Sequence, residues 1–190
     1  MNRGLFIDFN DSFSYNILSE FYLLDEKLDI INIDQLNDSY MSYCFYVFGP
    51  GPGHVADYKQ YFKFIQKIIN KPSPKLFICL GHQIFWYLKG AKIIESVNIK
   101  HGQTEDLFLS KNLQKKLGFS LNELKVQRYN SLSVKLSNLN IDNNTMAFNS
   151  DQELMLALGK DYLSYQFHPE SIGTIFRSQY FRYFIKNYLY

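Results

Sequence analysis

The sequence predicts an α/β fold: an open, mostly parallel sheet with helices on both faces, plus a small antiparallel β excursion. Three observations predict it. Up to residue 88, short apolar runs alternate with stretches whose apolar residues recur at helical spacing, which is typical of parallel strands connected by helices. From residue 91 to 163, short strand-like pieces alternate with turns rich in Asn, Asp and Ser. A length of 190 residues with 46% hydrophobic residues fits a single domain, 1–190.

Short apolar runs mark the expected strands. Each has the length of a buried strand, and the third runs directly into Gly49-Pro50-Gly51-Pro52-Gly53, where a strand must end. The expected strands of the sheet are 5–9, 28–33, 43–48, 75–79 and 163–167.

Helical spacing of apolar residues marks the connections. Residues 12–27 carry Phe13, Ile17 and Phe21 on one face, and residues 58–70 repeat the pattern until Pro72 and Pro74 stop it. Further helices are expected at 83–88 and, as a closing amphipathic helix, at 175–188, with an inserted loop or short helix at 113–125.

Composition narrows the class of protein. The 20 Lys and Arg against 18 Asp and Glu give a formal charge of +2, which argues against a nucleic-acid binder. No apolar run approaches the roughly 20 residues that cross a bilayer, so no membrane segment is expected. The amino terminus turns acidic too soon for a secretory signal. Two cysteines cannot build a disulfide framework, so we expect a soluble, cytoplasmic protein.

Cys79 is the first candidate for chemistry. It follows the apolar run 76–78 and precedes Leu80-Gly81-His82-Gln83, which opens a helix. A nucleophile on such a sharp turn projects above the sheet, the helix amino terminus favours its thiolate, and the N–H of Leu80 faces a possible oxyanion. The alternative is a buried, inert cysteine, as expected for Cys44, which lies in a strand pattern.

A nucleophilic cysteine needs a base, and His168 is the best placed histidine. It follows an expected strand end, where open α/β sheets carry their sites, and Glu170 could orient its imidazole. The alternative is a surface histidine before a Pro-Glu turn. His82 is expected to be structural, and His54 and His101 lie in loop-like segments. No Cys/His pair has the short spacing of a zinc site, so no metal site is expected.

The Gly-Pro run 49–53 is a third candidate. It lacks the Lys-Ser/Thr ending of a phosphate loop, and its prolines remove backbone donors. A stiff backbone without side chains suits a wall that approaches a substrate closely and offers one fixed N–H. A rigid turn without function is the alternative.

Five blocks, in order, resemble the class I (triad-type) glutamine amidotransferases, which have a flavodoxin-like core. The resemblance covers essentially the whole chain, from residue 5 to the last helix. The blocks are 50–53, similar to the oxyanion loop; 79–83, similar to the nucleophile elbow; 100–102; 128–132; and 166–171, similar to the His-Glu segment.

The resemblance implies a role for each matching residue. Cys79, His168 and Glu170 would form the catalytic triad, and the backbone N–H groups of Gly51 and Leu80 the oxyanion hole. Glutamine would be held by Gln83, Ser131 and Leu132. No metal or organic cofactor is implied for this chain.

Residues 7–16 narrow the resemblance to one branch. They are similar to the Asp-Asn-Tyr-Asp-Ser-Phe-Thr-Tyr-Asn opening of chorismate-using subunits, component II of anthranilate synthase and of aminodeoxychorismate (para-aminobenzoate) synthase. This implies that the partners are L-glutamine and a chorismate-binding synthase, component I, which would carry any Mg²⁺. Three other functions stay open: the same glutaminase serving another synthase, a stand-alone cysteine hydrolase or peptidase, and a catalytically idle interaction subunit.

Three positions depart from the family pattern. Phe77 stands where the family usually has glycine, two residues before the nucleophile, so its ring must find space beside the elbow. Gly49 precedes the oxyanion loop in place of serine, and His54 and Val55 follow it. Asn130 replaces the histidine of Tyr-His-Ser-Leu, and we expect it to be tolerated because the following pair contacts glutamine through its backbone.

Overall fold

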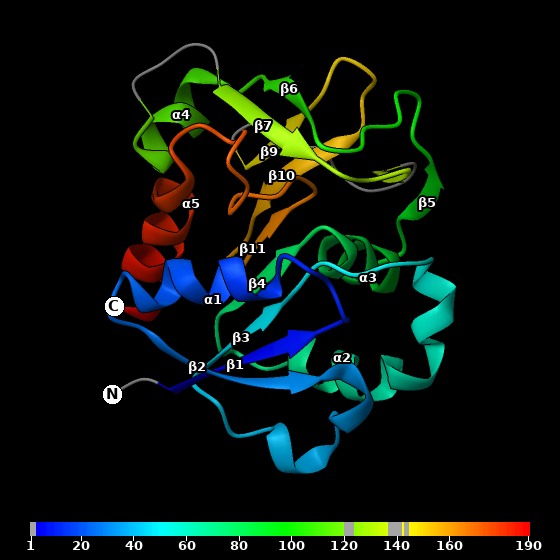
Figure 1. Cartoon of the computed structure of the whole chain (residues 1–190), viewed down its shortest axis with the longest axis vertical. Helices are drawn as coiled ribbons and strands as arrows, with labels where there is room; N and C mark the ends of the chain where they lie inside the picture. Colours follow the sequence, from blue (N-terminus) through cyan, green and yellow to red (C-terminus); the bar gives the residue numbers. More distant parts are fainter. Residues whose placement is uncertain (1–2, 120–123, 137–141, 143–144) are drawn as a thin grey trace.

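A seven-stranded sheet forms the centre of the computed structural model, which describes residues 3–119, 124–136, 142 and 145–190. The first five strands in spatial order run parallel, and the last two are antiparallel to their neighbours (Figure 1). In spatial order they are β2 (Lys27–Asn32), β1 (Arg3–Asp8), β3 (Phe45–Phe48), β4 (Lys75–Ile78), β11 (Tyr162–Tyr165), β10 (Leu154–Leu158) and β9 (Met146–Phe148). The predicted α/β class is confirmed.

Two small antiparallel pairs form the expected excursion. β5 (Lys92–Glu95) pairs with β8 (Leu132–Lys135), and β6 (Gln103–Leu107) pairs with β7 (Leu124–Arg128). The β6–β7 pair is drawn at the top of the view of Figure 1, above α1. His168 N donates to Gln127 O (3.0 Å), so this excursion is attached to the chain that follows β11.

Among the described residues, four α-helices lie between strands: α1 (Ser14–Tyr22), α2 (Phe62–Ile69), α3 (Leu80–Leu88) and α4 (Lys111–Leu117). A fifth, α5 (Arg177–Phe184), follows the last strand and is continued by a π-helical turn, Ile185–Leu189. None of the described helices has the length and apolar character needed to cross a bilayer.

Several elements are shorter than the sequence pattern predicts. The helix expected at 12–27 ends at Tyr22, because Asp25 takes a positive φ (61°) and reverses the chain into β2. Residues 58–61 of the helix expected at 58–70 belong to a 3₁₀ helix, Val55–Tyr61, and α2 begins at Phe62. The segment 113–125 contains the end of α4 and the start of β7, while 120–123 lie outside the described residues.

The alternating side chains of the central strands build two separate cores. Phe6, Phe45 and Leu76 pack on the side of α1 and α5, where the Phe21 ring lies 5.6 Å from that of Phe181. Ile7 and other residues of opposite parity pack against α2 and α3. Burial on both faces explains why these strands read as continuous apolar runs.

Candidate active site

Cys79 occupies a strained turn between β4 and α3. Its φ of 52° and ψ of −104° lie outside the conformations that a residue with a side chain normally adopts. Hydrogen bonds at both peptide groups hold it there: Cys79 N donates to Tyr165 O (2.8 Å), and Gln83 N donates to Cys79 O (3.0 Å). This is the geometry of a nucleophile elbow at the carboxyl end of a parallel strand, as the sequence predicts.

Gly81 lets α3 start against the end of β3. A Cβ at this position would lie 2.4 Å from Phe48 O, and Gly81 N donates to Gly49 O (3.1 Å). The elbow and the Gly-Pro loop are therefore held together by backbone contact that leaves no room for a side chain.

Phe77 finds its space below the elbow. Its ring stacks between those of Phe48 and Phe85, with centroids 4.9 Å and 4.4 Å away. The side chain thus points into the core under α3, so the residue that departs from the family pattern fills the interface between β4 and α3.

The two cysteines lie in opposite environments. Cys79 is 7% exposed at the elbow. Cys44 was expected to be buried in a strand, but β3 begins only at Phe45 and Cys44 is exposed. The expectation was wrong because an apolar pattern does not show where the strand enters the sheet.

His168 and Glu170 form a buried pair. His168 Nδ1 lies 2.7 Å from Glu170 Oε1, and both side chains are at most 2% exposed. Burial alone would lower the pKa of His168, but the Glu170 carboxylate and the nearby Cys79 sulfur raise that pKa well above its usual value. The sulfur makes no well-aligned hydrogen bond to Nε2 among the described residues.

A cavity of about 120 Å³ opens beside Cys79. Its lining contains six of the eight predicted site residues together with four neighbours: Gly51, Pro52, Gly53, Cys79, Leu80, Gln83, Tyr129, Asn130, Ser131 and Leu132. Among the described residues, the N–H groups of Gly51 and Leu80 have no hydrogen-bond partner. They therefore remain available to bind an oxyanion in this cavity. His168 and Glu170 do not belong to its lining, although the Cys79 sulfur is close enough to His168 to raise its pKa.

Two aromatic side chains and one amide side chain lie at the site but were not predicted from the sequence. The Tyr129 and Phe13 rings lie 4.9 Å and 5.2 Å from the His168 ring. Gln166 Nε2 lies 3.9 Å from Cys79 Sγ. All three belong to blocks singled out by resemblance, but pattern alone does not show which block members turn inward.

The remaining histidines lie outside the cavity lining. His82 is fully buried in α3 beside Trp86, and burial lowers its pKa to about 3. His54 caps the 3₁₀ helix that follows the Gly-Pro loop, accepting from Ala56 N through Nδ1 (3.0 Å). No group of three or more His, Cys, Asp or Glu suited to a metal ion exists in the part of the chain that the structure describes.

Comparison with protein families matches residues 5–188 to the family described as glutamine amidotransferase class-I. The chain belongs to this family. A solved glutamine amidotransferase from Thermotoga maritima superposes with a TM-score of 0.70 at 18% identity, over 98% of this chain and 82% of that chain, and shares the fold.

Relatives of this amidotransferase extend over its whole length. It is 35% identical to anthranilate synthase component 2 of Helicobacter pylori over 185 residues, covering 90% of this chain and 89% of the relative. It is 32% identical to aminodeoxychorismate/anthranilate synthase component 2 of Bacillus subtilis over 192 residues, covering 97% and 96%. The resemblance seen in the sequence is confirmed at the level of the family.

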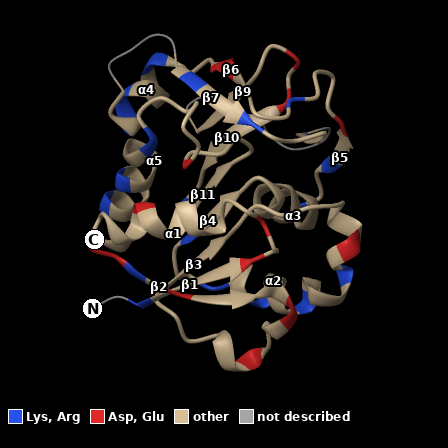
Figure 2. Cartoon of the chain, in the orientation of Figure 1, with Lys and Arg blue, Asp and Glu red and all other residues tan. Residues whose placement is uncertain are grey.

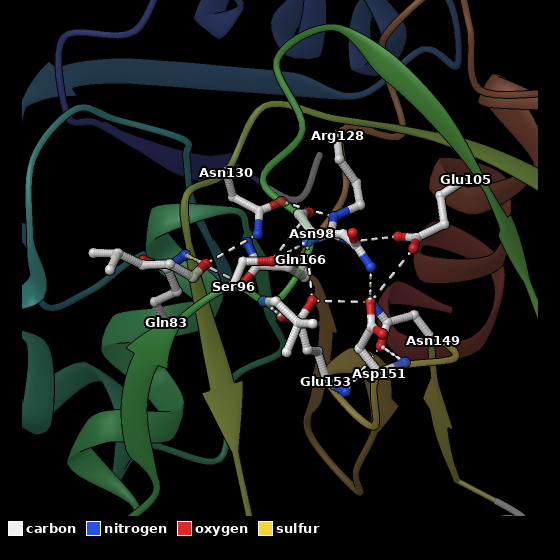
Figure 3. Close-up of polar contacts among 12 residues, drawn as sticks. Gln83, Ser96, Asn98, Glu105, Arg128, Asn130, Asn149, Asp151, Glu153 and Gln166 are labelled. Atoms are coloured by element: carbon white, nitrogen blue, oxygen red, sulfur yellow. Dashed lines mark hydrogen bonds and ion pairs between the residues drawn. The ribbon is translucent and has the colours of Figure 1, made fainter.

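Behind the cavity wall of this amidotransferase lies a buried polar network (Figure 3). Arg128, with no exposed side-chain surface, forms ion pairs with Glu105 and with Glu153 (3.0 Å). It also donates to Ser96 Oγ (3.0 Å) and Asn130 Oδ1 (3.0 Å). The network fixes the end of β7, and through it the loop that carries Ser131 and Leu132.

Proposed function

We propose that this chain is the glutaminase subunit of a chorismate-using synthase, hydrolysing glutamine through Cys79, His168 and Glu170. The observation that carries the proposal is the strained Cys79 turn beside a buried His168–Glu170 pair, with the cavity of predicted glutamine-binding residues opening at the same cysteine.

The reaction begins when the Cys79 thiolate attacks the side-chain carboxamide carbon of glutamine. The tetrahedral oxyanion is held by the N–H groups of Leu80 and Gly51, each contributing about 3 kcal/mol in comparable sites. His168 protonates the leaving ammonia as the C–N bond breaks, leaving a glutamyl thioester on Cys79. His168 then takes a proton from water, which attacks the thioester as the C–S bond breaks. This restores the Cys79 thiolate and the His168 imidazolium, and the product acid loses its proton to solvent as glutamate.

Glu170 acts on His168 rather than on substrate. Its carboxylate at Nδ1 fixes the tautomer that presents Nε2 and stabilises the imidazolium. The chemistry is acyl transfer to sulfur followed by hydrolysis, so this chain needs no metal or organic cofactor. Any Mg²⁺ belongs to the chorismate site of the partner.

Glutamine is held by Gln83, Ser131 and Leu132. Gln83 Nε2 already donates to Leu132 O (2.7 Å) and to Gln166 Oε1 (3.2 Å), which occupies its donors. Gln83 Oε1 has no donor among the described residues, so it can accept from an N–H of bound glutamine.

The partner is a chorismate-binding synthase subunit, as the component 2 names of the relatives suggest. Its docking element is residues 8–16 together with α1. Glu20 is the only charged residue of α1, whose ribbon is otherwise uncoloured by charge in Figure 2. Glu20 is buried, whereas Tyr15 and Tyr22 are 72% and 76% exposed. An uncharged face with exposed aromatics is typical of the centre of a protein–protein interface. Direct transfer of ammonia across this interface keeps it unprotonated, because the ammonia is not released into water.

Replacement of the nucleophile tests the function. With the chorismate-binding subunit present, Cys79→Ala should abolish glutamine-dependent product formation while ammonium salts still support it. Cys44→Ala is the matched control and should keep full turnover, because Cys44 is exposed and lies outside the site. Glutamine-dependent synthesis by Cys79→Ala would rule the mechanism out.

The same assay separates the other functions. Rapid glutamine hydrolysis at a rate that does not change when the chorismate-binding subunit is added would indicate a stand-alone hydrolase. Activation only by a different synthase would reassign the partner. A wild-type chain that hydrolyses no glutamine in either setting would indicate an idle interaction subunit.

A further inference from the structure

Three side-chain amides connect the buried Arg128 to Cys79. Asn130 Nδ2 donates to Leu132 O (3.0 Å), and Gln83 Nε2 donates to the same carbonyl oxygen (2.7 Å). Gln83 Nε2 also donates to Gln166 Oε1 (3.2 Å), and Gln166 Nε2 lies 3.9 Å from Cys79 Sγ. Figure 3 shows Gln83, Asn130 and Gln166 to the left of Arg128, with dashed lines between them.

The chemistry of the partners dictates how each amide is turned. Arg128 can only donate, so Asn130 must present its oxygen to the guanidinium (3.0 Å) and its nitrogen to Leu132 O. The Leu132 carbonyl can only accept, so Gln83 must also present nitrogen. Because the Gln83 nitrogen also donates to the Gln166 side chain, Gln166 must present its oxygen to Gln83. Gln166 is left with its NH₂ group facing the sulfur.

We infer that Gln166 is a further catalytic residue, which donates an N–H hydrogen bond to the Cys79 thiolate. Gln166 has no exposed surface, so water does not compete for the donor. A hydrogen bond to the charged form of a group favours that form, and this donor faces the reacting atom itself. Arg128, Asn130 and Gln83 are positioning residues, because they act through the orientation of Gln166.

This inference rests on the proposed role of Cys79, but its test needs no partner and no glutamine. The isolated chain is treated with iodoacetamide at pH 7, and alkylation of each cysteine is followed by peptide mass spectrometry. Alkylation requires the thiolate, so its rate reports how well the protein stabilises that form. Exposed Cys44 is an internal control in the same molecule.

Gln166→Met keeps the length of the side chain and removes the donor. We expect Cys79 alkylation to slow by about tenfold, the effect of losing one hydrogen bond to a charged group. The rate against pH should move to higher pH, while the Cys44 rate stays unchanged. The urea unfolding midpoint should fall modestly, because methionine also removes the acceptor of Gln83 Nε2. Cys79 alkylation as fast as in the wild type, in the folded variant without urea, would overturn the inference.

Asn130→Asp tests the positioning chain. An aspartate can still accept from Arg128 but cannot donate to Leu132 O, so the Gln83 and Gln166 amides lose part of their orientation. We expect a smaller slowing of Cys79 alkylation than in Gln166→Met, with Cys44 again unchanged. A Cys79 rate equal to that of the wild type would remove the positioning role from Asn130.

The two proposals fail separately. A wild-type chain that shows no glutaminase activity with the synthase subunit would refute the proposed function, while slower Cys79 alkylation in Gln166→Met would still establish the hydrogen bond. Conversely, unchanged alkylation in an active glutaminase would refute the role of Gln166 alone.

Discussion

At the scale of single residues, His168 and Glu170 carry unequal parts of the proposed reaction. His168 is the acid and base, whereas Glu170 orients it from 2.7 Å and stabilises its charged form. We expect His168→Ala to remove glutamine-dependent turnover. Glu170→Gln should lower it less, because an amide oxygen still accepts from Nδ1–H but carries no charge. Steady-state glutamine hydrolysis with the synthase subunit measures both.

Wild-type rates in both variants would show that neither residue takes part. A larger loss for Glu170→Gln than for His168→Ala would assign the essential proton transfer to the carboxylate instead.

At the scale of the secondary-structure elements, His82 affects the stability of the fold. It is buried in α3 and does not line the cavity. Burial lowers its pKa from 6.5 to about 3, so the folded state keeps it neutral where the unfolded chain binds a proton. The stability from this difference is fully present above pH 6.5. It is lost as pH falls towards 3, by about 1.4 kcal/mol per pH unit.

We therefore expect urea unfolding of His82→Leu to lose part of the acid-side decline in the free energy of unfolding between pH 6.5 and 4. His101→Leu is the matched control, because His101 is exposed, and it should keep the wild-type decline. Identical pH profiles for His82→Leu and wild type would show that His82 does not set the acid sensitivity.

Also at the scale of the elements, α3 and β3 meet at Gly81. A methyl group there would lie 2.4 Å from Phe48 O, so Gly81→Ala must push the start of α3 away from β3. We expect the free energy of unfolding to fall by about 1–3 kcal/mol. Glutamine hydrolysis should fall with it, because Cys79 and Leu80 move with the helix. Unfolding curves and turnover equal to the wild type would mean that the contact relaxes without cost.

At the scale of the whole molecule, α1 has a single charged residue, which is buried, whereas Lys and Arg gather on α4 and on α5, which packs against α1 (Figure 2). Glu20, the charged residue of α1, accepts from Ser178 Oγ (2.7 Å) and fastens α1 to the segment that forms α5. The exposed Tyr15 and Asn16 are thus presented on a fixed helix, as a docking surface requires.

Tyr15→Ala together with Asn16→Ala should leave the fold and any basal glutaminase activity intact, since both side chains are exposed. We expect the double variant to lose co-elution with the chorismate-binding subunit and its activation. Phe108→Ala, which removes an exposed aromatic ring elsewhere, is the matched control and should keep both. Unchanged co-elution of the double variant would contradict the interface, and the roles of Cys79 and His168 would survive.

The sequence predicted that most residues of the candidate site would lie near one another, because they follow strand ends. Gly51 and Cys79 each come shortly after an apolar run, and parallel strands bring such ends to one edge of the sheet. Tyr129 and Gln166 were missed because the sequence alone does not show which neighbours of a motif turn towards His168 or towards the Cys79 sulfur. Cys44 was misplaced for a related reason: the strand expected to begin at residue 43 begins two residues later, at Phe45.

By itself, the sequence determined the parallel sheet, the turn at Cys79 and the family. The spacing of apolar residues, the glycines and the prolines act on the local backbone, so their effects can be read without the tertiary structure. Only the tertiary structure decided how distant side chains meet: Phe13 against His168, Arg128 between Glu105 and Glu153, and Gln166 turned by Gln83 towards Cys79. Such contacts depend on which strands become neighbours and on which hydrogen-bond partners remain after burial. Both are properties of the packed chain, because each buried donor and acceptor must find its partner among residues far away in sequence.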